Sequence, residues 1–225
     1  GYTKWFGEVH ANTDVHFDVL PGEIHALVGE NGAGKSTLLK LIYGVYQPDA
    51  GEILVDVVVH RLDSPAGARA LGIGMVFQHF SLFETLTVVE NVALALPGAP
   101  DLGYLARRIE KVAEKYGLPA DARRLVHALS VGERQRVEII RCLLQNPKLL
   151  IMDEPTSVLT PQAVRKLFET LRQLAAEGCS ILYISHKLDE IQALCHTATV
   201  LRGGKVTGHC VPSQETPKPM ARLMI

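Results

Sequence analysis

The sequence predicts an α/β fold built on a mostly parallel β-sheet with helices on both faces, an antiparallel β portion at the N-terminus and an inserted helical lobe. Three observations carry this prediction. Apolar strand patterns alternate with helical patterns along most of the 225 residues, a glycine-rich loop joins a strand to a helix near residue 29, and a long helical pattern interrupts the alternation from about residue 80 to 144. We therefore expect a single domain over residues 1–225, with the lobe at about 80–144.

The N-terminal part of the chain has the two-residue periodicity of strands. Apolar and polar residues alternate over 15–19 and again over 24–28, and Pro21-Gly22 marks a turn between them. A helix is expected to begin near Ser36. Residues 52–59 have the pattern of one further strand.

Helix-start signals organise the rest of the chain. Ser64 before Pro65 predicts an N-cap followed by the first helical residue, and Thr160 precedes a proline in the same way. Capping-box spacing follows Thr87 and Ser130. Short apolar runs predict buried strands at 73–77, 149–153 and 180–184.

Composition restricts the function classes. Hydrophobic residues make up 47% of the chain and charged residues 21%, and the formal net charge of -1 gives no electrostatic reason to expect nucleic acid as a partner. No apolar run reaches the roughly 18–20 residues of a membrane span, and the N-terminus has no signal-peptide pattern. The four cysteines lack metal-ligand spacing, so we expect free thiols in a reducing cytosol: Cys142, Cys179, Cys195 and Cys210.

Residues 29–36 match the phosphate-binding pattern G-x-x-x-x-G-K-S, with a strand before them and a helix after them. The glycines let backbone N–H groups converge on the β- and γ-phosphates, Lys35 adds a positive charge, and the hydroxyl of Ser36 binds Mg²⁺. The alternative is a glycine-rich turn without a ligand, which the strand–loop–helix context disfavours. The pattern indicates a P-loop NTPase core that holds a nucleoside triphosphate through Gly29, Asn31, Gly32, Ala33, Gly34, Lys35, Ser36 and Thr37.

The apolar strand at 149–153 leads into two acidic residues, Asp153 and Glu154. Because the carboxyl ends of parallel strands meet at one edge of a sheet, we expect Asp153 beside the phosphate loop, where its carboxylate helps to hold Mg²⁺. Glu154 is expected where an attacking water would lie, as a general base or water-polarising group. The alternative is a solvated strand end with two exposed acids, which the phosphate loop upstream disfavours.

Three further motifs distinguish between families of phosphate-loop proteins. The segment Leu129-Ser130-Val131-Gly132-Glu133-Arg134-Gln135 begins a helix upstream of Asp153, Gln78 closes a strand, and His186 follows the last core strand. In order and spacing these resemble the signature motif, the Q-loop glutamine and the switch histidine of ATP-binding-cassette (ABC) ATPases, over essentially the whole chain. A lone histidine is more often structural, so the interpretation of His186 rests on the combination.

The resemblance implies that two cassettes pair head to tail, so that Ser130 and Gly132 of one face the γ-phosphate held by the loop of the other. Ser130 would hydrogen-bond that phosphate, and Gly132 would permit a close backbone approach. It also implies that His186 contacts the γ-phosphate in cis, that Gln78 contacts metal or water, and that Phe6 stacks on adenine. The choice of ATP, with Mg²⁺, therefore rests on the resemblance.

Two segments depart from the family pattern. Val131 stands where the first signature glycine is usual, and Glu133 stands where glutamine is usual. The D-loop, often S-A-L-D, reads Ser157-Val158-Leu159-Thr160. Thr160 is able to cap the following helix but brings no carboxylate, which puts in doubt the usual D-loop contacts across the pair.

The signature variant and the segment 155–162 resemble the ATPases of bacterial nucleoside importers, with simple-sugar importers of the ribose and galactose type as the alternative. This implies transmembrane permease subunits as partners, a substrate-binding lipoprotein as an indirect partner, and a peripheral place on the cytoplasmic face of the inner or plasma membrane. The segment 79–90 is expected to meet the permease, unless Phe80 and Phe83 belong to the core of the lobe. Such ATPases usually carry two cassettes, and this chain, which ends at 223–225, is expected to be the first.

Two other functions stay open on the sequence. One is a soluble, non-transport ABC ATPase that acts on DNA or ribosomes. The lobe has no heptads, which disfavours the DNA-acting forms with long coiled coils. The other is a regulatory half-site that binds ATP and hardly hydrolyses it, which the full set of cis catalytic residues (Lys35, Glu154 and His186) disfavours.

Overall fold

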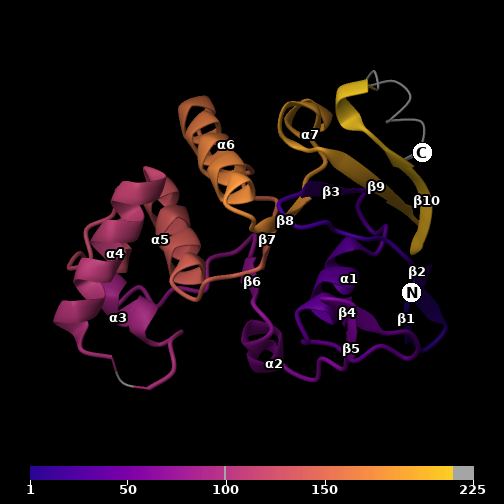
Figure 1. Cartoon of the computed structure of the whole chain (residues 1–225), viewed down its shortest axis with the longest axis horizontal. Helices are drawn as coiled ribbons and strands as arrows, with labels where there is room; N and C mark the ends of the chain where they lie inside the picture. Colours follow the sequence, from indigo (N-terminus) through magenta and orange to yellow (C-terminus); the bar gives the residue numbers. More distant parts are fainter. Residues whose placement is uncertain (99, 215–225) are drawn as a thin grey trace.

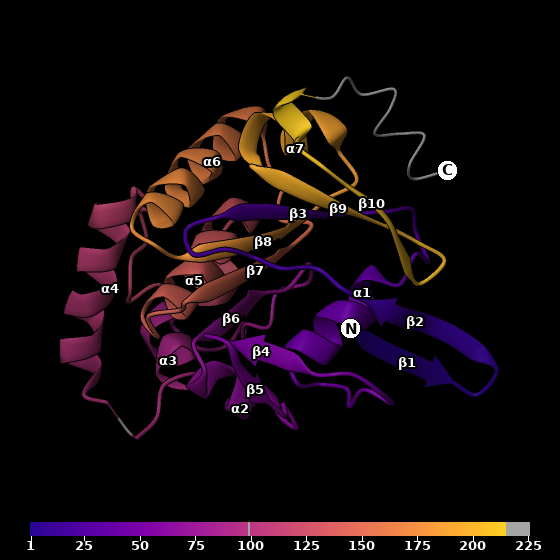
Figure 2. The same ribbon diagram turned by 45° about the vertical axis from the view of Figure 1, so that its right-hand side comes forward.

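The computed structural model describes residues 1–98 and 100–214, and it centres on a six-stranded sheet in the order β10-β9-β3-β8-β7-β6. Neighbouring strands pair in parallel, except that β10 runs antiparallel to β9 at one edge. The predicted α/β fold with a mostly parallel sheet is therefore confirmed (Figures 1 and 2). The strands are β3 (Ile24–Val28), β6 (Ile73–Val76), β7 (Leu149–Asp153), β8 (Ser180–Ile184), β9 (Thr197–Arg202) and β10 (Lys205–Cys210).

An antiparallel hairpin of β1 (Tyr2–Phe6) and β2 (Val9–Val15) precedes the central sheet and confirms the predicted N-terminal β portion. β2 ends at Val15, so the alternating pattern over 15–19 does not continue as a strand. Phe17 and Val19 nevertheless pack against the buried core, which explains their apolar character.

A second hairpin, of β4 (Ile53–Val55) and β5 (Val58–His60), shows that the prediction of one strand over 52–59 was wrong. The chain reverses at Asp56 and Val57, whose φ values of 51° and 66° suit the two-residue turn of a tight hairpin. Glycine and asparagine usually occupy such positions, and a β-branched residue is an outlier there. Because the apolar run continues through Val57, the sequence pattern did not reveal the turn.

Two groups of helices cover the two faces of the sheet. Helices α1 (Lys35–Ile42) and α2 (Pro65–Ala70) share a buried cluster with one face. Helices α6 (Pro161–Ala176) and α7 (Leu188–Leu194) share a cluster with the other. Successive residues of a strand point to opposite faces, so β3 contributes Leu27 to the first cluster and Ile24, Ala26 and Val28 to the second.

The inserted lobe consists of α3 (Val88–Ala93), α4 (Leu102–Tyr116) and α5 (Val131–Leu143), with 3₁₀ turns at 126–128 and, beyond the lobe, at 212–214. Figure 1 shows it on the left, on the far side of the molecule from β9 and β10. Its buried residues belong to the cluster that α6 shares with the sheet. Residues 99 and 215–225, including the expected end of the cassette at 223–225, lie outside the described part.

The predicted helix starts are confirmed. The Ser64 side chain caps α2, Thr160 caps α6, and capping boxes begin α3 at Thr87 and α5 at Ser130. In the α5 box, Glu133 Oε2 accepts from the Ser130 N–H at 2.8 Å. These caps fix where each helix begins.

An ion pair reinforces the capping box of α5. Arg124 Nη1 donates to Glu133 Oε1 at 2.6 Å. The hydrogen bonds that Ser130 donates, together with Arg124, lower the pKa of Glu133. The helix therefore begins with an ionised carboxylate that is bonded both to its own N-cap and to a cation.

The loop before α3 is bound to the lobe through buried polar side chains. The Asn91 side chain accepts from the Phe83 N–H at 2.7 Å and donates to the Phe83 carbonyl at 3.0 Å. Glu138 of α5, 1% exposed, accepts from the Ser81 N–H at 2.7 Å, and Arg141 donates both to Glu138 and to the Ser81 hydroxyl. The loop is thus fixed to α5.

Within the described residues, none of the helices combines the length and the apolar character needed to cross a membrane. All four cysteines are reduced thiols and not halves of disulfides, as predicted. Burial raises the pKa of Cys142 to about 12 and that of Cys179 to about 11. These thiols are therefore poor nucleophiles at neutral pH.

A buried histidine, His25, lies on β3. Its ring nitrogens bond to Thr199 Oγ1 at 2.8 Å and to Glu23 Oε1 at 3.1 Å. Burial lowers the pKa of His25, and His209 acts in the same direction, whereas Glu23 and Asp18 oppose it. The folded protein therefore favours the neutral imidazole.

We expect the free energy of unfolding to fall as the pH drops from about 7.5 to about 5.5. The folded-state pKa of His25 lies below the unfolded value of about 6.5, so the unfolded chain binds the proton first. This contribution is complete above the unfolded pKa and is lost as the pH falls towards the folded pKa. Denaturant titrations of the wild type, His25→Gln and the exposed-site control His127→Gln measure it. A pH dependence in His25→Gln equal to that of the wild type would contradict the assignment.

Candidate functional site

The carboxyl ends of β3, β7 and β8 meet at one edge of the sheet, beside a cavity of about 520 Å³. Gly29 and Ala33 are buried within the phosphate loop and do not line the cavity. The cavity brings together most of the predicted site residues: Asn31, Gly32, Gly34, Lys35, Ser36, Thr37, Gln78, Asp153, Glu154 and His186.

The phosphate loop requires glycine at Gly34. Its φ is 98°, and an added Cβ would lie 2.4 Å from the carbonyl oxygen of Ala11. The Lys35 ammonium donates to the carbonyls of Gly29 at 2.5 Å and Glu30 at 2.9 Å, so it is held over the loop. Burial lowers the pKa of Lys35, although Glu154 and Asp153 oppose the shift. A positive charge that is partly shielded from water attracts an anion more strongly than a fully solvated one.

Residues that are distant in the sequence form hydrogen bonds to the backbone of the phosphate loop. Asn12 of β2 is fully buried, and its Nδ2 donates to the Gly34 carbonyl at 3.2 Å. The Gly204 N–H donates to the Ala33 carbonyl at 3.0 Å. Sequence reasoning missed these residues, and it also missed the other parts of β2 and of the β9–β10 turn that line the cavity: Val9, His10, Ala11 and Gly203. The paired glycines at 203–204 were the one visible signal.

The two strand-end acids differ in their surroundings. Burial and the neighbouring Glu154 raise the pKa of Asp153, and Lys35 opposes this. Glu154 has a φ of 47°, and its Oε1 lies 2.9 Å from Nδ1 of His186. The second oxygen of Glu154 is buried and finds no hydrogen-bond partner among the described residues. That oxygen is available to accept a proton or a hydrogen bond from a bound molecule.

The donors in the cavity suit a magnesium ion. Ser36 offers a hydroxyl, Gln78 an amide oxygen and Asp153 a carboxylate, and Mg²⁺ prefers such hard oxygen ligands. Among the described residues, no group of three or more His, Cys, Asp or Glu side chains forms a self-sufficient metal cage. Mg²⁺ usually takes few protein carboxylates and completes its shell with phosphate oxygens and water, so the residues fit this ion.

Three predicted residues lie apart from the cavity. Phe6 is 45% exposed, packs edge-on against Tyr46 at 5.4 Å, and lies opposite Val9, which does line the cavity. Ser130 is exposed at the start of α5. A Cβ on Gly132 would come no nearer than 3.8 Å to a neighbouring atom, so packing within this chain does not require glycine there.

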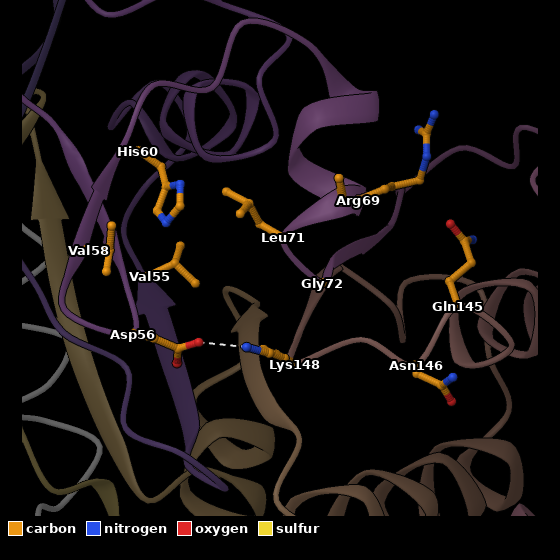
Figure 3. A pocket seen from close by; sticks show the side chains of 11 residues that line it. Val55, Asp56, Val58, His60, Arg69, Leu71, Gly72, Gln145, Asn146 and Lys148 are labelled. Carbon is orange, nitrogen blue, oxygen red and sulfur yellow. Dashed lines mark hydrogen bonds and ion pairs between the residues drawn. The ribbon is translucent and has the colours of Figure 1, made fainter. Parts of the chain in front are cut away.

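A second cavity, of about 440 Å³, lies at the opposite end of the sheet, where β6 and β7 begin (Figure 3). Its Lys148 is already paired with Asp56 at 2.6 Å. Arg69, in the last turn of α2, donates to the Tyr43 hydroxyl at 3.4 Å. These basic side chains therefore have local partners, and the chemistry favours the first cavity as the functional site.

The sequence pattern of the ABC transporter family matches residues 12–157. The chain is 43% identical over 227 residues to the nucleoside import ATP-binding protein NupA of Lactococcus lactis subsp. cremoris, covering 99% of this chain and 45% of that protein. It is 42% identical over 229 residues to the ribose import ATP-binding protein RbsA 1 of Rubrobacter xylanophilus, covering 100% and 46%. The chain thus spans about half the length of the curated relatives that it matches.

Solved structures agree with the fold. A crystal structure of the ADP conformation of an ATP-binding cassette superposes with a TM-score of 0.84 at 28% identity, over 93% of this chain and 88% of that one. A dimeric cassette in a post-hydrolysis state, bound to ADP and Pi, superposes with a TM-score of 0.80 at 26% identity, over 94% and 95%.

Proposed function

The chain belongs to the ABC transporter family, and on that premise we propose that it binds Mg-ATP and hydrolyses it to power an importer in the membrane. This proposal rests on one observation: the loop lysine Lys35, the strand-end acids Asp153 and Glu154, and His186 all line the same cavity. The ADP-bound cassettes among the structural relatives support ATP as the nucleotide.

Binding and orientation are assigned to the loop and its neighbours. Backbone N–H groups of the loop and the Lys35 ammonium would hold the phosphates, with the start of α1 adding its positive end. Ser36, Gln78 and Asp153 would hold Mg²⁺, which neutralises phosphate charge. Phe6 would contribute to the adenine platform from the rim, beside Val9.

Proton transfer is assigned to Glu154. Its unpartnered oxygen would accept the proton of an attacking water, and its other oxygen is oriented by His186. His186 would also donate to the γ-phosphate. Because the unpartnered oxygen of Glu154 is buried, little solvent reorganisation is needed there when charge develops.

A second cassette is proposed as a partner, in trans or in a longer chain. Ser130 and Gly132 are exposed or half-exposed and lie outside the cavity, and packing within this chain does not require glycine at Gly132. A dimeric cassette among the structural relatives supports a composite site. Each active site would then combine the loop of one cassette with the start of α5 of the other.

Transmembrane permease subunits are proposed as partners through the segment 79–90, which would place the chain peripherally on the cytoplasmic face of the membrane. Phe83 is 60% exposed, which disfavours the alternative that it belongs to the core, whereas Phe80 is half-buried. Glu138 of α5 accepts from Ser81 of this segment, and Asn91 of α3 is bonded to Phe83. A movement of the permease against this segment would therefore be transmitted to α5, the helix that Ser130 caps.

We propose a nucleoside as the cargo, delivered by a substrate-binding lipoprotein, with simple sugars as the second candidate. Relatives of similar identity include a nucleoside import protein and ribose and glucose import proteins, so identity alone does not separate these classes. The support is the signature variant with Val131 and the segment 155–162. The site residues named above are assigned to the nucleotide, and the choice of cargo would belong to the permease and the binding protein.

Glu154→Gln should retain ATP binding and lower ATP turnover by about 10²–10⁴-fold, because the amide keeps the shape but does not accept the proton. Turnover and nucleotide affinity are measured on the same preparation. Glu30→Gln, which changes an exposed carboxylate of the same loop outside the cavity, serves as the control and should behave as the wild type. Turnover of Glu154→Gln within about threefold of the wild type would reject the assignment.

ATP hydrolysis by the isolated chain should rise faster than linearly with protein concentration, because half of each composite site comes from a second copy. The rate per mole of chain is followed across the micromolar range at saturating Mg-ATP. Ser130→Ala should lower the rate at every concentration. A rate per mole of chain that stays constant over this range would count against shared sites.

A strain that lacks this gene should lose uptake of labelled adenosine or guanosine and keep uptake of ribose and galactose. The wild-type gene should restore uptake, and the Glu154→Gln variant should not. Loss of sugar uptake with nucleoside uptake unchanged would replace the proposed cargo and leave the ATPase assignment in place.

A further inference from the structure

A buried carboxylate on α7, Glu190, lies at the centre of a hydrogen-bond network that none of the roles above uses. Its Oε2 accepts from the hydroxyls of Tyr183 at 2.8 Å and Thr156 at 2.7 Å. Its Oε1 accepts from the ammonium of Lys187 at 3.1 Å. Glu190 is 7% exposed, and burying a carboxylate is costly unless hydrogen bonds replace water, as they do here.

Lys187 closes the network onto Thr156. Its ammonium also donates to Oγ1 of Thr156 at 3.2 Å and to the carbonyl oxygen of Thr156 at 3.3 Å. The three donors of the lysine thus meet three acceptors. Burial and the adjacent Glu190 raise the pKa of Tyr183, so its hydroxyl stays protonated and donates. Each polar group in the network therefore has a partner.

The two ends of the network adjoin the proposed catalytic pair. Thr156 lies two residues after Glu154, and Lys187 follows His186 directly. Glu154 has positive φ, a conformation that costs energy for a residue with a side chain and persists where the surrounding structure enforces it. The segment after Glu154 therefore needs anchors that keep it in place.

Hydrogen bonds anchor the backbone both at Glu154 itself and at the residues that follow it. Before the acid side chain, the Glu154 N–H donates to the Ile184 carbonyl at 3.0 Å, which continues the ladder between β7 and β8. After it, Gln135 of α5 donates to the Pro155 carbonyl, and Thr156 is bonded to Glu190 and Lys187. Glu190 is the one charged acceptor among these anchors.

We infer that Glu190 is a positioning residue, which acts through Thr156 and Lys187 to hold the 2.9 Å contact between Glu154 Oε1 and His186 Nδ1. The kinetic consequence rests on the proposed function. The geometric consequence does not, because the contact exists in the chain without nucleotide.

The test compares Glu190→Gln with the wild type. Glutamine keeps the size but offers one acceptor oxygen, so it leaves either the hydroxyls or the ammonium unsatisfied. We expect ATP turnover to fall about tenfold with the KM for ATP changed less than about twofold, because the phosphate loop is untouched while the proton acceptor is misplaced. In the nucleotide-free protein, the imidazole ¹⁵N resonances of His186 should shift.

Two controls separate positioning from general stability. Glu177→Gln removes a carboxylate that likewise accepts from a lysine, Lys115 at 2.7 Å, and from a tyrosine, Tyr116 at 2.6 Å, but lies outside the cavity. It should leave turnover and the His186 resonances unchanged. Thr156→Val should reproduce the effect of Glu190→Gln, and Thr156→Ser, which keeps the hydroxyl, should not.

The same pair of Thr156 variants decides the matter if Glu190→Gln does not fold. Unshifted His186 resonances, with turnover within about twofold of the wild type, in Glu190→Gln or Thr156→Val would overturn the inference. Losses of turnover that multiply in the double variant would also overturn it, because members of one network should not act independently. If the wild type itself fails to hydrolyse Mg-ATP, the proposed function is wrong, and the His186 resonances still test the positioning role.

Discussion

The parallel pairing of β3, β7 and β8 is the constraint on which the site depends. Ile184 of β8 lies opposite Leu27 of β3 and Asp153 of β7, so the three chains leave the sheet at the same level. A register shift of one residue would turn every side chain of a strand to the other face, and burial on both faces opposes such a shift. The phosphate loop, the acids and His186 are neighbours for this reason, although they are distant in the sequence.

The edge of the sheet that forms the site carries fewer lysines than acidic residues. Two acids share it with one lysine, and burial disfavours the ionised form of Asp153 as well as the protonated form of Lys35. A divalent cation bound together with phosphates would bring both signs of charge into the cavity at once. The electrostatics therefore favour a metal–phosphate pair over either component alone.

Sequence reasoning located the residues whose type and spacing have a chemical meaning, such as Lys35, Asp153 and the helix caps. It did not find Asn12, Gly204 or Glu190, because their contacts depend on strands and helices that only the tertiary fold brings together. It placed one strand where a hairpin lies, because the turn at Asp56 and Val57 contains neither glycine nor asparagine. The roles of all the site residues stay predictions, and the cavity of one chain does not include Phe6, Ser130 or Gly132.

The capping box of α5 has a consequence for how this helix end would bind the proposed phosphate. Glu133 is bonded to the N-cap and to Arg124, so the first turn is ordered and charge-compensated within the chain itself. The entropy of ordering that turn is therefore lost on folding and not on binding, which is the meaning of preorganisation. If this end binds the phosphate proposed for it, the same carboxylate would offset the helix dipole, so the attraction would depend on direct hydrogen bonds more than on long-range charge.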